Sequence, residues 1–178
     1  MTPVIRSGRP DEADAVHELA AATFPLACPP GTTEADIAAF VAEHLSAERV
    51  AGYLADPQRR ILVAERDGLL LGYTMLVLAD PADPEVAAAV TTRPTAELSK
   101  CYLRPDAHGG GLAAALVEAT VEEAARAGAV SVWLGVNQRN ARANRFYEKS
   151  GFAVVGTKHF RVGAHLHDDF TRERMLRA

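Results

Sequence analysis

Three consecutive glycines stand where a strand-like run gives way to a helical pattern. The strand-like run ends at Leu103, and the helical pattern follows Gly109, Gly110 and Gly111. A helix N-terminus carries about half a positive charge and several unpaired N–H groups, and glycines let a phosphate come close to those groups. The turn is therefore a candidate pyrophosphate cradle, with a flexible connector as the alternative. The Gly-Lys-Ser/Thr of a P-loop is absent, and a dinucleotide fold would place its glycines after an earlier strand.

A second group of polar and aromatic residues follows the next predicted strand. Asn140 and Tyr147 are seven residues apart, which is two helical turns, so they share one face of a predicted helix. Phe146 can enter the core while the phenol of Tyr147 points to a cleft. Taken alone, the pattern also fits an aromatic pair in the core with Asn140 as the helix N-cap.

Together the two groups resemble the GNAT superfamily of acyl-CoA-dependent N-acyltransferases. The family's pyrophosphate motif, Arg/Gln-x-x-Gly-x-Gly/Ala, falls on His108 to Ala113. The pattern Asn-x-x-Ala-x-x-Phe-Tyr-x-x-x-Gly-Phe falls without gaps on Asn140 to Phe152. The resemblance is specific over residues 97–152 and follows the order of elements elsewhere, most closely that of the spermidine/polyamine branch. His108 departs from the motif, so a guanidinium contact to phosphate would be lost or replaced by a weaker one from the imidazole.

The resemblance implies a single N-acetyltransferase domain over residues 1–178 that uses acetyl-CoA as co-substrate and no metal. It also implies an α/β (α+β) three-layer sandwich, with helices on both faces of a mixed, mostly antiparallel sheet that is splayed at its centre. By the same resemblance, the cofactor-binding residues are Tyr102, Leu103, His108, Gly109, Gly110, Gly111, Leu112, Ala113, Asn140 and Tyr147.

Two catalytic roles follow from the resemblance. Glu97 is the candidate base that takes a proton from the acceptor amine, which is mostly protonated at neutral pH; an exposed carboxylate at the end of a strand is the alternative. Tyr147 is the candidate acid that protonates the departing CoA thiolate. The backbone N–H near Leu103 would hold the acetyl carbonyl, as an oxyanion donor does.

Other reactive side chains favour plainer interpretations. Strand alternation predicts that Ser99 shares a face with Glu97, and Cys101 on the same strand is expected to be inert packing and not an acetyl carrier. His159, His165 and His167 lack convergent spacing, so solvated imidazoles are expected in place of a metal site.

The elements that must position these residues can be read from periodicity and turn residues. Strands are predicted over 4–6, 60–65, 69–78, 96–103, 130–136, 152–160 and 169–176. Helices are predicted over 11–24, from 34 to about 44, 46–55, 109–127 and 140–149. Asp67-Gly68 predicts a hairpin turn, and residues 80–95, which contain three prolines, predict a surface loop. This order of elements indicates one sheet with helices on both faces.

Composition limits the classes of function. The chain has 178 residues, of which 48% are hydrophobic, a net charge of −4 and two cysteines. These values argue against a nucleic-acid binder and a disulfide framework. The charged N-terminus argues against a signal peptide, and no apolar run is long enough to span a membrane, so a cytoplasmic protein is expected. High Ala and Arg usage suggests a bacterial source. A small-molecule amine is the expected partner, neither nucleic acid nor a membrane is expected, and a homodimer is left open.

Three hypotheses concern the activity. The first is acetyl transfer to a small primary amine, with a polyamine as the favoured acceptor. The second is acetylation of a peptide N-terminus or lysine, and the third is an acyl-CoA-binding sensor without turnover, against which the presence of Tyr147 argues. The polyamine hypothesis depends on a cleft that concentrates cations, framed by the carboxylates of Glu34, Asp36, Glu43, Glu97, Asp168 and Asp169.

Overall fold

Seven strands form one mixed sheet in the computed structural model, which describes residues 1–177. The strand order is β1-β2-β3-β4-β5-β7-β6. Every neighbouring pair is antiparallel except β4 and β5, which are parallel. The predicted mixed, mostly antiparallel sheet is confirmed. Its strands are β1 (Val4–Ser7), β2 (Arg59–Arg66), β3 (Leu69–Val77), β4 (Thr95–Leu103), β5 (Ser131–Asn137), β6 (Ala153–Val162) and β7 (His165–Met175).

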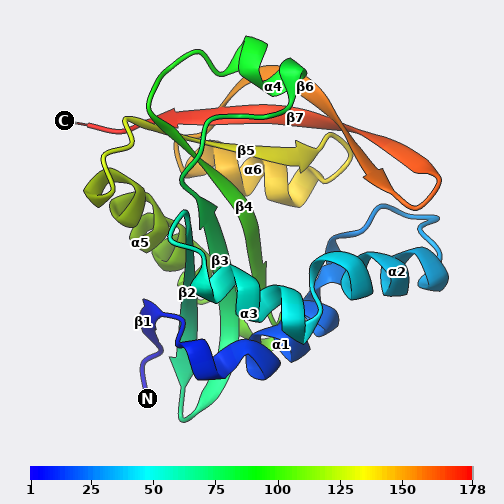
Figure 1. Ribbon diagram of the computed structural model, residues 1–178, viewed down its shortest axis with the longest axis vertical. Coiled ribbons are helices and arrows are strands. Elements are labelled where there is room, and N and C mark those ends of the chain that lie inside the picture. Colours follow the sequence, from blue (N-terminus) through cyan, green and yellow to red (C-terminus); the bar gives the residue numbers. More distant parts are fainter. Residues whose placement is uncertain (178) are drawn as a thin grey trace.

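Helices cover both faces of this sheet, as predicted (Figure 1). On one face, the first three helices pack on Ile61, Val63, Tyr73 and Met75. On the other, the fifth and sixth helices enclose a core that includes Leu98, Leu134 and Phe152. The helices are α1 (Ala13–Ala27), α2 (Glu34–His44), α3 (Ala47–Ala55), α4 (Pro84–Ala89), α5 (Leu112–Arg126) and α6 (Ala141–Lys149), with short 3₁₀ turns at Pro10–Glu12 and Pro105–Ala107.

Local sequence signals explain several element boundaries. The side chain of Ser46 accepts a hydrogen bond from the Arg49 N–H and begins α3, as an N-cap does. Asp67 and Gly68 both have positive φ, at 53° and 81°, which is what the tight turn between β2 and β3 requires. The predicted hairpin is therefore confirmed at the residues that signalled it.

The sheet is splayed at its centre. β4 and β5 are paired at three positions only, from Thr95 opposite Ser131 to Glu97 opposite Trp133. Beyond Glu97 the two strands diverge: β2, β3 and β4 run down the view of Figure 1, while β5, β7 and β6 cross its top. The edge of β4 that faces β5 consequently has no strand partner from residue 98 to residue 103 within the described chain.

A β-bulge in β4 changes which side chains share a face. Leu98 lies opposite Leu76 and Lys100 lies opposite Met75, so Ser99 is an extra residue in the register. The extra residue reverses the alternation of faces. Lys100, and not Ser99, therefore shares the α1 face with Glu97, and the prediction for Ser99 is wrong.

The structure corrects two further expectations. The predicted surface loop over 80–95 contains α4, because the side chain of Asp83 accepts a hydrogen bond from the Glu85 N–H and Pro84 occupies the first turn. Val86 and Val90 then pack on Trp133. The last two strands are also longer than predicted: β6 and β7 extend through Val162 and His165 to a turn at Gly163, where φ is 58°.

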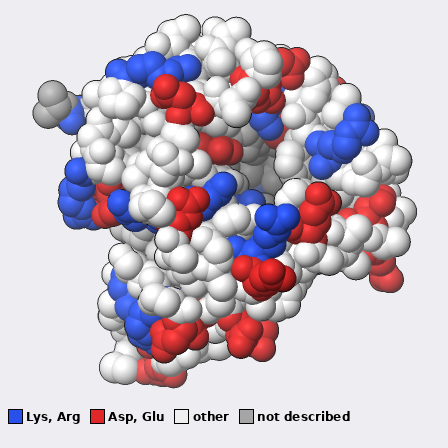
Figure 2. Space-filling view, in the orientation of Figure 1, with Lys and Arg blue, Asp and Glu red and all other residues white. Residues whose placement is uncertain are grey.

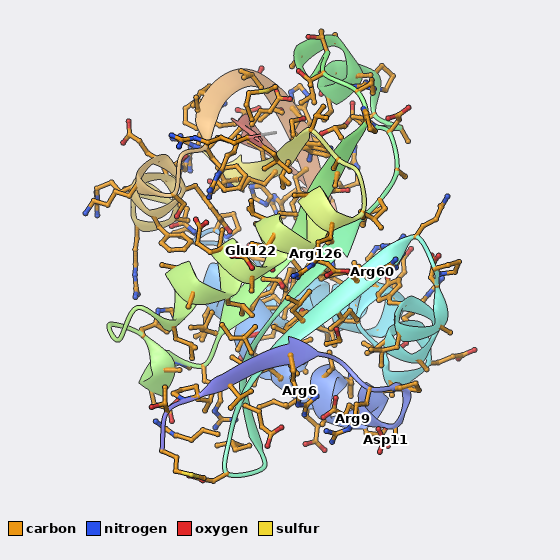
Figure 3. The ribbon with its side chains drawn as sticks, turned by 90° about the vertical axis from the view of Figure 1, so that its left-hand side faces the viewer. Arg6, Arg9, Asp11, Arg60, Glu122 and Arg126 are labelled. Atoms are coloured by element: carbon orange, nitrogen blue, oxygen red, sulfur yellow. The ribbon has the colours of Figure 1, made fainter. Side chains whose placement is uncertain are left out.

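Charged side chains tie the N-terminal strand to its neighbours (Figure 3). Arg6 on β1 donates to the carboxylates of Glu12, at 2.6 and 2.9 Å, and of Glu65. Glu12 also accepts a hydrogen bond from the Arg9 N–H at 2.7 Å, and Asp11 lies 3.4 Å from the Arg9 side chain. These bonds hold the pKa of Glu12 down, at about 2, chiefly through the hydrogen bond from Arg6. The strand and the first turn of the chain are thus locked together.

Candidate active site

A cavity of about 890 Å³ opens where β4 and β5 diverge. Its walls come from the end of α1, from β4, from the glycine turn before α5, from β5 and α6, and from the β6–β7 hairpin. Figure 2 shows a hollow on this face of the molecule with both acidic and basic side chains at its walls. The fold therefore gathers residues that are far apart in the sequence around one space.

The glycine turn forms one end of the cavity. Gly109 and Gly111 line it with φ of 88° and 76°, a left-handed conformation that favours glycine. No described side chain caps the start of α5. The first hydrogen bond of this helix runs from the Ala115 N–H to the Gly111 carbonyl, at 3.0 Å. The preceding N–H groups are therefore available to an anion. Ala113 lines the cavity, whereas Gly110 and Leu112 do not belong to its described lining.

A guanidinium lies beside this turn, although the motif position itself is His108. Arg142, in the first turn of α6, places its Nη2 atom 2.6 Å from Nδ1 of His108. The other ring nitrogen of His108, Nε2, lies 3.2 Å from the Leu103 carbonyl and can donate to it. Arg142 therefore brings a guanidinium to the glycine turn, in place of the one that the motif would have at position 108. Nothing in a linear motif reveals this, because residues 108 and 142 meet only through the fold.

Three other predicted cofactor-binding residues lie at the cavity. The side chain of Asn140 accepts a hydrogen bond from the Ala143 N–H at 3.0 Å, so it is the N-cap of α6. The ring of Tyr102 lies on the α1 face, edge-on to Phe24 with centroids 6.4 Å apart. Leu103 is buried, and it reaches the site through the backbone carbonyl that faces His108.

Tyr147 and Cys101 meet on the α6 side of β4. Burial raises the pKa of the Tyr147 phenol well above its ordinary value. Burial also raises the pKa of the Cys101 thiol, to about 11, while the neighbouring Tyr147 acts in the other direction. Both groups therefore stay protonated at neutral pH. Cys101 is half-buried and lines the cavity, and its raised pKa makes it a poor nucleophile.

Glu97 and Lys100 lie on the opposite face of β4, near enough for each charge to act on the other. Burial raises the pKa of the Glu97 carboxyl, while the charges of Lys100, Lys158 and Arg59 act in the other direction. Burial lowers the pKa of Lys100, and the charge of Glu97 opposes that change. Glu97 lines the cavity, so it is not the exposed carboxylate at the end of a strand that the alternative interpretation required.

A second pair of opposite charges lies deeper in the same face, and sequence reasoning missed one partner. Lys158 on β6 and Asp169 on β7 are cross-strand neighbours. The Lys158 Nζ atom lies 3.8 Å from Oδ2 of Asp169. No pattern along the chain predicts that β6 brings a lysine to this position, because the pairing depends on the register of the last hairpin.

The prediction that six carboxylates frame an acidic cleft is largely wrong. Within residues 1–177, Glu97 and Asp169 line the cavity, whereas Glu34, Asp36, Glu43 and Asp168 do not. Asp168 instead lies 3.4 Å from His159, which also contacts Glu85 of α4.

The part of the chain that the structure describes holds no group of three or more His, Cys, Asp or Glu side chains suited to a metal ion. None of its helices is long and apolar enough to cross a membrane.

Comparison with known proteins places this fold and this motif in one family. The model of the acetyltransferase (GNAT) family matches residues 13–152. An uncharacterized N-acetyltransferase of Mycobacterium tuberculosis is 48% identical over 165 residues, which cover 93% of this chain and 98% of that protein. A further uncharacterized N-acetyltransferase, from Lactobacillus delbrueckii subsp. lactis, is 27% identical over 141 residues, 79% of each chain.

Solved structures share the same architecture. The PaiA N-acetyltransferase of Thermoplasma acidophilum, solved in complex with coenzyme A, superimposes with a TM-score of 0.78 at 22% identity, covering 99% of this chain and 100% of that one. YncA of Salmonella typhimurium, solved with acetyl-CoA, gives a TM-score of 0.67 at 20% identity, covering 100% and 96%. The family model matches most of the chain, and the splayed sheet and the glycine turn before α5 agree with that match. The chain belongs to the acetyltransferase (GNAT) family.

Proposed function

We propose that this protein transfers an acetyl group from acetyl-CoA to a primary amine by direct attack in a ternary complex. The observation that carries the proposal is the divergence of β4 and β5. It opens one cavity whose lining includes the glycine turn, Glu97 and Tyr147. A donor held at the turn and an acceptor near Glu97 would then meet beside Tyr147.

The donor end offers three kinds of contact. The free N–H groups at the start of α5 can hold phosphate oxygens. Arg142 adds a positive charge beside them, and charge-assisted hydrogen bonds to phosphate are the stronger kind. The unpaired edge of β4 can bond the amides of an extended pantetheine arm, as a strand edge bonds a peptide. The residues present therefore fit acetyl-CoA as co-substrate.

Glu97 and Tyr147 supply the two proton transfers. The carboxylate of Glu97 takes a proton from the amine, directly or through water, because the amine must be neutral to attack. Tyr147 gives its phenolic proton to the thiolate as the C–S bond breaks. The surroundings that raise the pKa of the Cys101 thiol to about 11 would also make a departing thiolate a stronger base than in water. This basicity helps a phenol with a raised pKa to act as the donor.

The proposed acceptor is a small primary amine. A polyamine is the second candidate for this acceptor. The half-buried carboxylate of Glu97 and the buried carboxylate of Asp169 favour an acceptor that carries an ammonium group. The acidic rim that would have strengthened the polyamine hypothesis is absent from the described lining, and Lys100 and Lys158 stand beside the two carboxylates that remain.

Tyr147→Phe tests the acid directly, because it removes one oxygen and keeps the packing ring. We expect kcat to fall roughly 10- to 1,000-fold, within and just below the range for removal of a general acid, with little change in the Kd for acetyl-CoA. Steady-state thiol release and calorimetry measure the two quantities. An unchanged kcat, with chemistry shown to limit the rate, would contradict the role of the phenol. Phe146→Leu on the same helix controls for loss of packing.

A further inference from the structure

The acceptor end of the cavity carries charges of both signs on one face of the sheet. Glu97 and Lys100 come from β4, and Lys158 and Asp169 come from the last hairpin. Lys158 contributes to the electrostatic surroundings of Glu97 as well as those of Asp169. An acceptor that enters here therefore meets two carboxylates and two ammonium groups. A polyamine, which is cationic along its whole length, would face repulsion from both lysines.

Lys158 and Asp169 are held in a defined place. Their side chains are 13% and 8% exposed, and Lys158 Nζ also lies 5.5 Å from the centre of the Phe160 ring. Gly135 on β5 provides the room: a Cβ atom there would lie 3.2 Å from Oδ2 of Asp169 and 3.3 Å from Nζ of Lys158. A side chain at position 135 would therefore crowd the pair.

One oxygen of this pair lacks a protein partner. Oδ1 of Asp169 is buried and receives no hydrogen bond within residues 1–177, although the residue lines the cavity. A buried carboxylate oxygen without a hydrogen bond is costly. Rotation of the carboxylate would bring this oxygen to the cavity, where an N–H group of a bound molecule would satisfy it. Lys158, whose ammonium has three donors, can bond an anionic group of the same molecule.

Building on the proposed acetyltransferase activity, we infer that the acceptor is an amine that also carries a carboxylate, such as a free amino acid. Lys158 binds the carboxylate and Asp169 accepts a hydrogen bond from the amine or from a neighbouring N–H. The other end of the cavity is occupied by the donor, so the acceptor must be small. Lys158 and Asp169 are then specificity-determining residues for the same site.

Matched acceptors test this inference without any change in the protein. Thiol release from acetyl-CoA is measured with leucine, with leucinamide, with isoamylamine and with spermidine, and the same set is repeated with glutamate and methionine and their matched amides. We expect kcat/KM for the best amino acid to exceed that of its amide by roughly tenfold or more, as for a charged hydrogen bond in a buried site.

Lys158→Met keeps the aliphatic stem and removes the charge. It should lower kcat/KM for the amino acid roughly tenfold more than it lowers kcat/KM for the amide, because both reactions use the Glu97 carboxyl near Lys158 and only the amino acid offers a carboxylate. A merely structural role would lower both values alike. Lys149→Met, on the exposed end of α6, is the control and should change neither value. Lys158→Arg should restore part of the preference.

Other outcomes separate this inference from the proposed function. Equal values for amino acid and amide, or a preference for spermidine, would overturn the inference and leave the acetyltransferase activity standing. Transfer to no amine of any class, with acetyl-CoA bound, would overturn both. A preference for the amino acid that survives Lys158→Met intact would show that another group reads the carboxylate and would overturn the assignment to Lys158.

Discussion

Glu97 and Tyr147 reach the cavity from opposite faces of β4, and their surroundings act differently on the pKa of each group. Glu97 has charged neighbours, among them Lys100 and Lys158, and a carboxyl whose pKa is raised by burial. Tyr147 has Cys101 and aromatic rings around it, with the Phe152 ring 6.0 Å away. The ammonium and guanidinium charges around Glu97 therefore oppose the effect of burial and favour its carboxylate form, while the phenol keeps the proton that we propose it donates.

Glu97→Gln should change the pH dependence of the reaction. The pKa of Glu97 lies above that of an ordinary glutamate, so kcat/KM should fall as pH falls through this raised pKa and the base becomes protonated. We expect Glu97→Gln to lower kcat/KM by about 10²- to 10⁴-fold and to abolish that step. Because both proteins use the same amine, the titration of the amine cancels in the ratio of their rates. A Glu97→Gln profile parallel to that of wild type would contradict the role, and Glu148→Gln serves as control.

Arg142 should contribute to binding of the donor and not to chemistry. Its guanidinium contacts His108 beside the glycine turn, and it is exposed, so solvent weakens its attraction for phosphate. We expect Arg142→Gln to raise the Kd of acetyl-CoA roughly three- to tenfold in calorimetry, with kcat at saturation unchanged. Arg145→Gln, one turn further along the same helix, supplies the comparison. Identical Kd values for the two variants would show that the phosphates lie elsewhere.

At the scale of elements, ion pairs hold the β1–β2 side of the sheet in place while its centre stays open. Arg60 on β2 lies 3.3 Å from Glu123 near the end of α5, and Arg126 lies 3.1 Å from the same carboxylate; Figure 3 shows both arginines with Glu122 beside the last turns of that helix. At the other end, Arg6 joins β1 to β2 through Glu65. The cavity therefore opens beside the half of the sheet that these ion pairs hold in place.

Glu12→Gln tests how much the N-terminal cluster contributes to stability. The folded-state pKa of Glu12 is about 2, below its unfolded value. The contribution is therefore present above the unfolded pKa and is lost as pH falls toward 2. We expect the variant to lower the free energy of unfolding by about 1–3 kcal/mol at pH 7, and the difference from wild type to shrink between about pH 5 and pH 2. Urea unfolding at pH 7 and pH 3 measures this difference.

Asp11→Asn provides the comparison for Glu12, because the Asp11 side chain is 78% exposed and contacts the same Arg9. It should change stability by no more than about 0.5 kcal/mol. If Glu12→Gln behaved like Asp11→Asn at pH 7, the cluster would not stabilise the fold.

At the scale of the whole molecule, the features that depend on neighbouring residues were predictable and those that depend on pairing between distant strands were not. The turn at Asp67-Gly68, the start of the third helix at Ser46 and the glycine turn are local signals, and the structure has each where the sequence indicated. The bulge at Ser99 leaves no local signal, because it arises from the register of β4 against β3. The Lys158–Asp169 pair and the approach of Arg142 to His108 depend likewise on tertiary structure.

The arrangement of the sheet bears on domain organisation. Its order carries the chain from β1 at one edge to β6 at the other, and the cavity is lined by elements from α1 to β7. We propose that residues 1–178 act as a single catalytic domain, since removal of either half of the sheet would remove one wall of the cavity.

The central claim is that acetyl transfer to an amine takes place in the cavity between β4 and β5. The most direct test mixes the protein with acetyl-CoA and a panel of primary amines, and measures free thiol together with the acetylated amine by mass spectrometry. The account predicts multiple turnovers with one acetylated amine formed for each thiol released, and a rate that falls in both Glu97→Gln and Tyr147→Phe. Tight binding of acetyl-CoA without turnover by any amine would contradict it and would indicate an acyl-CoA-binding sensor.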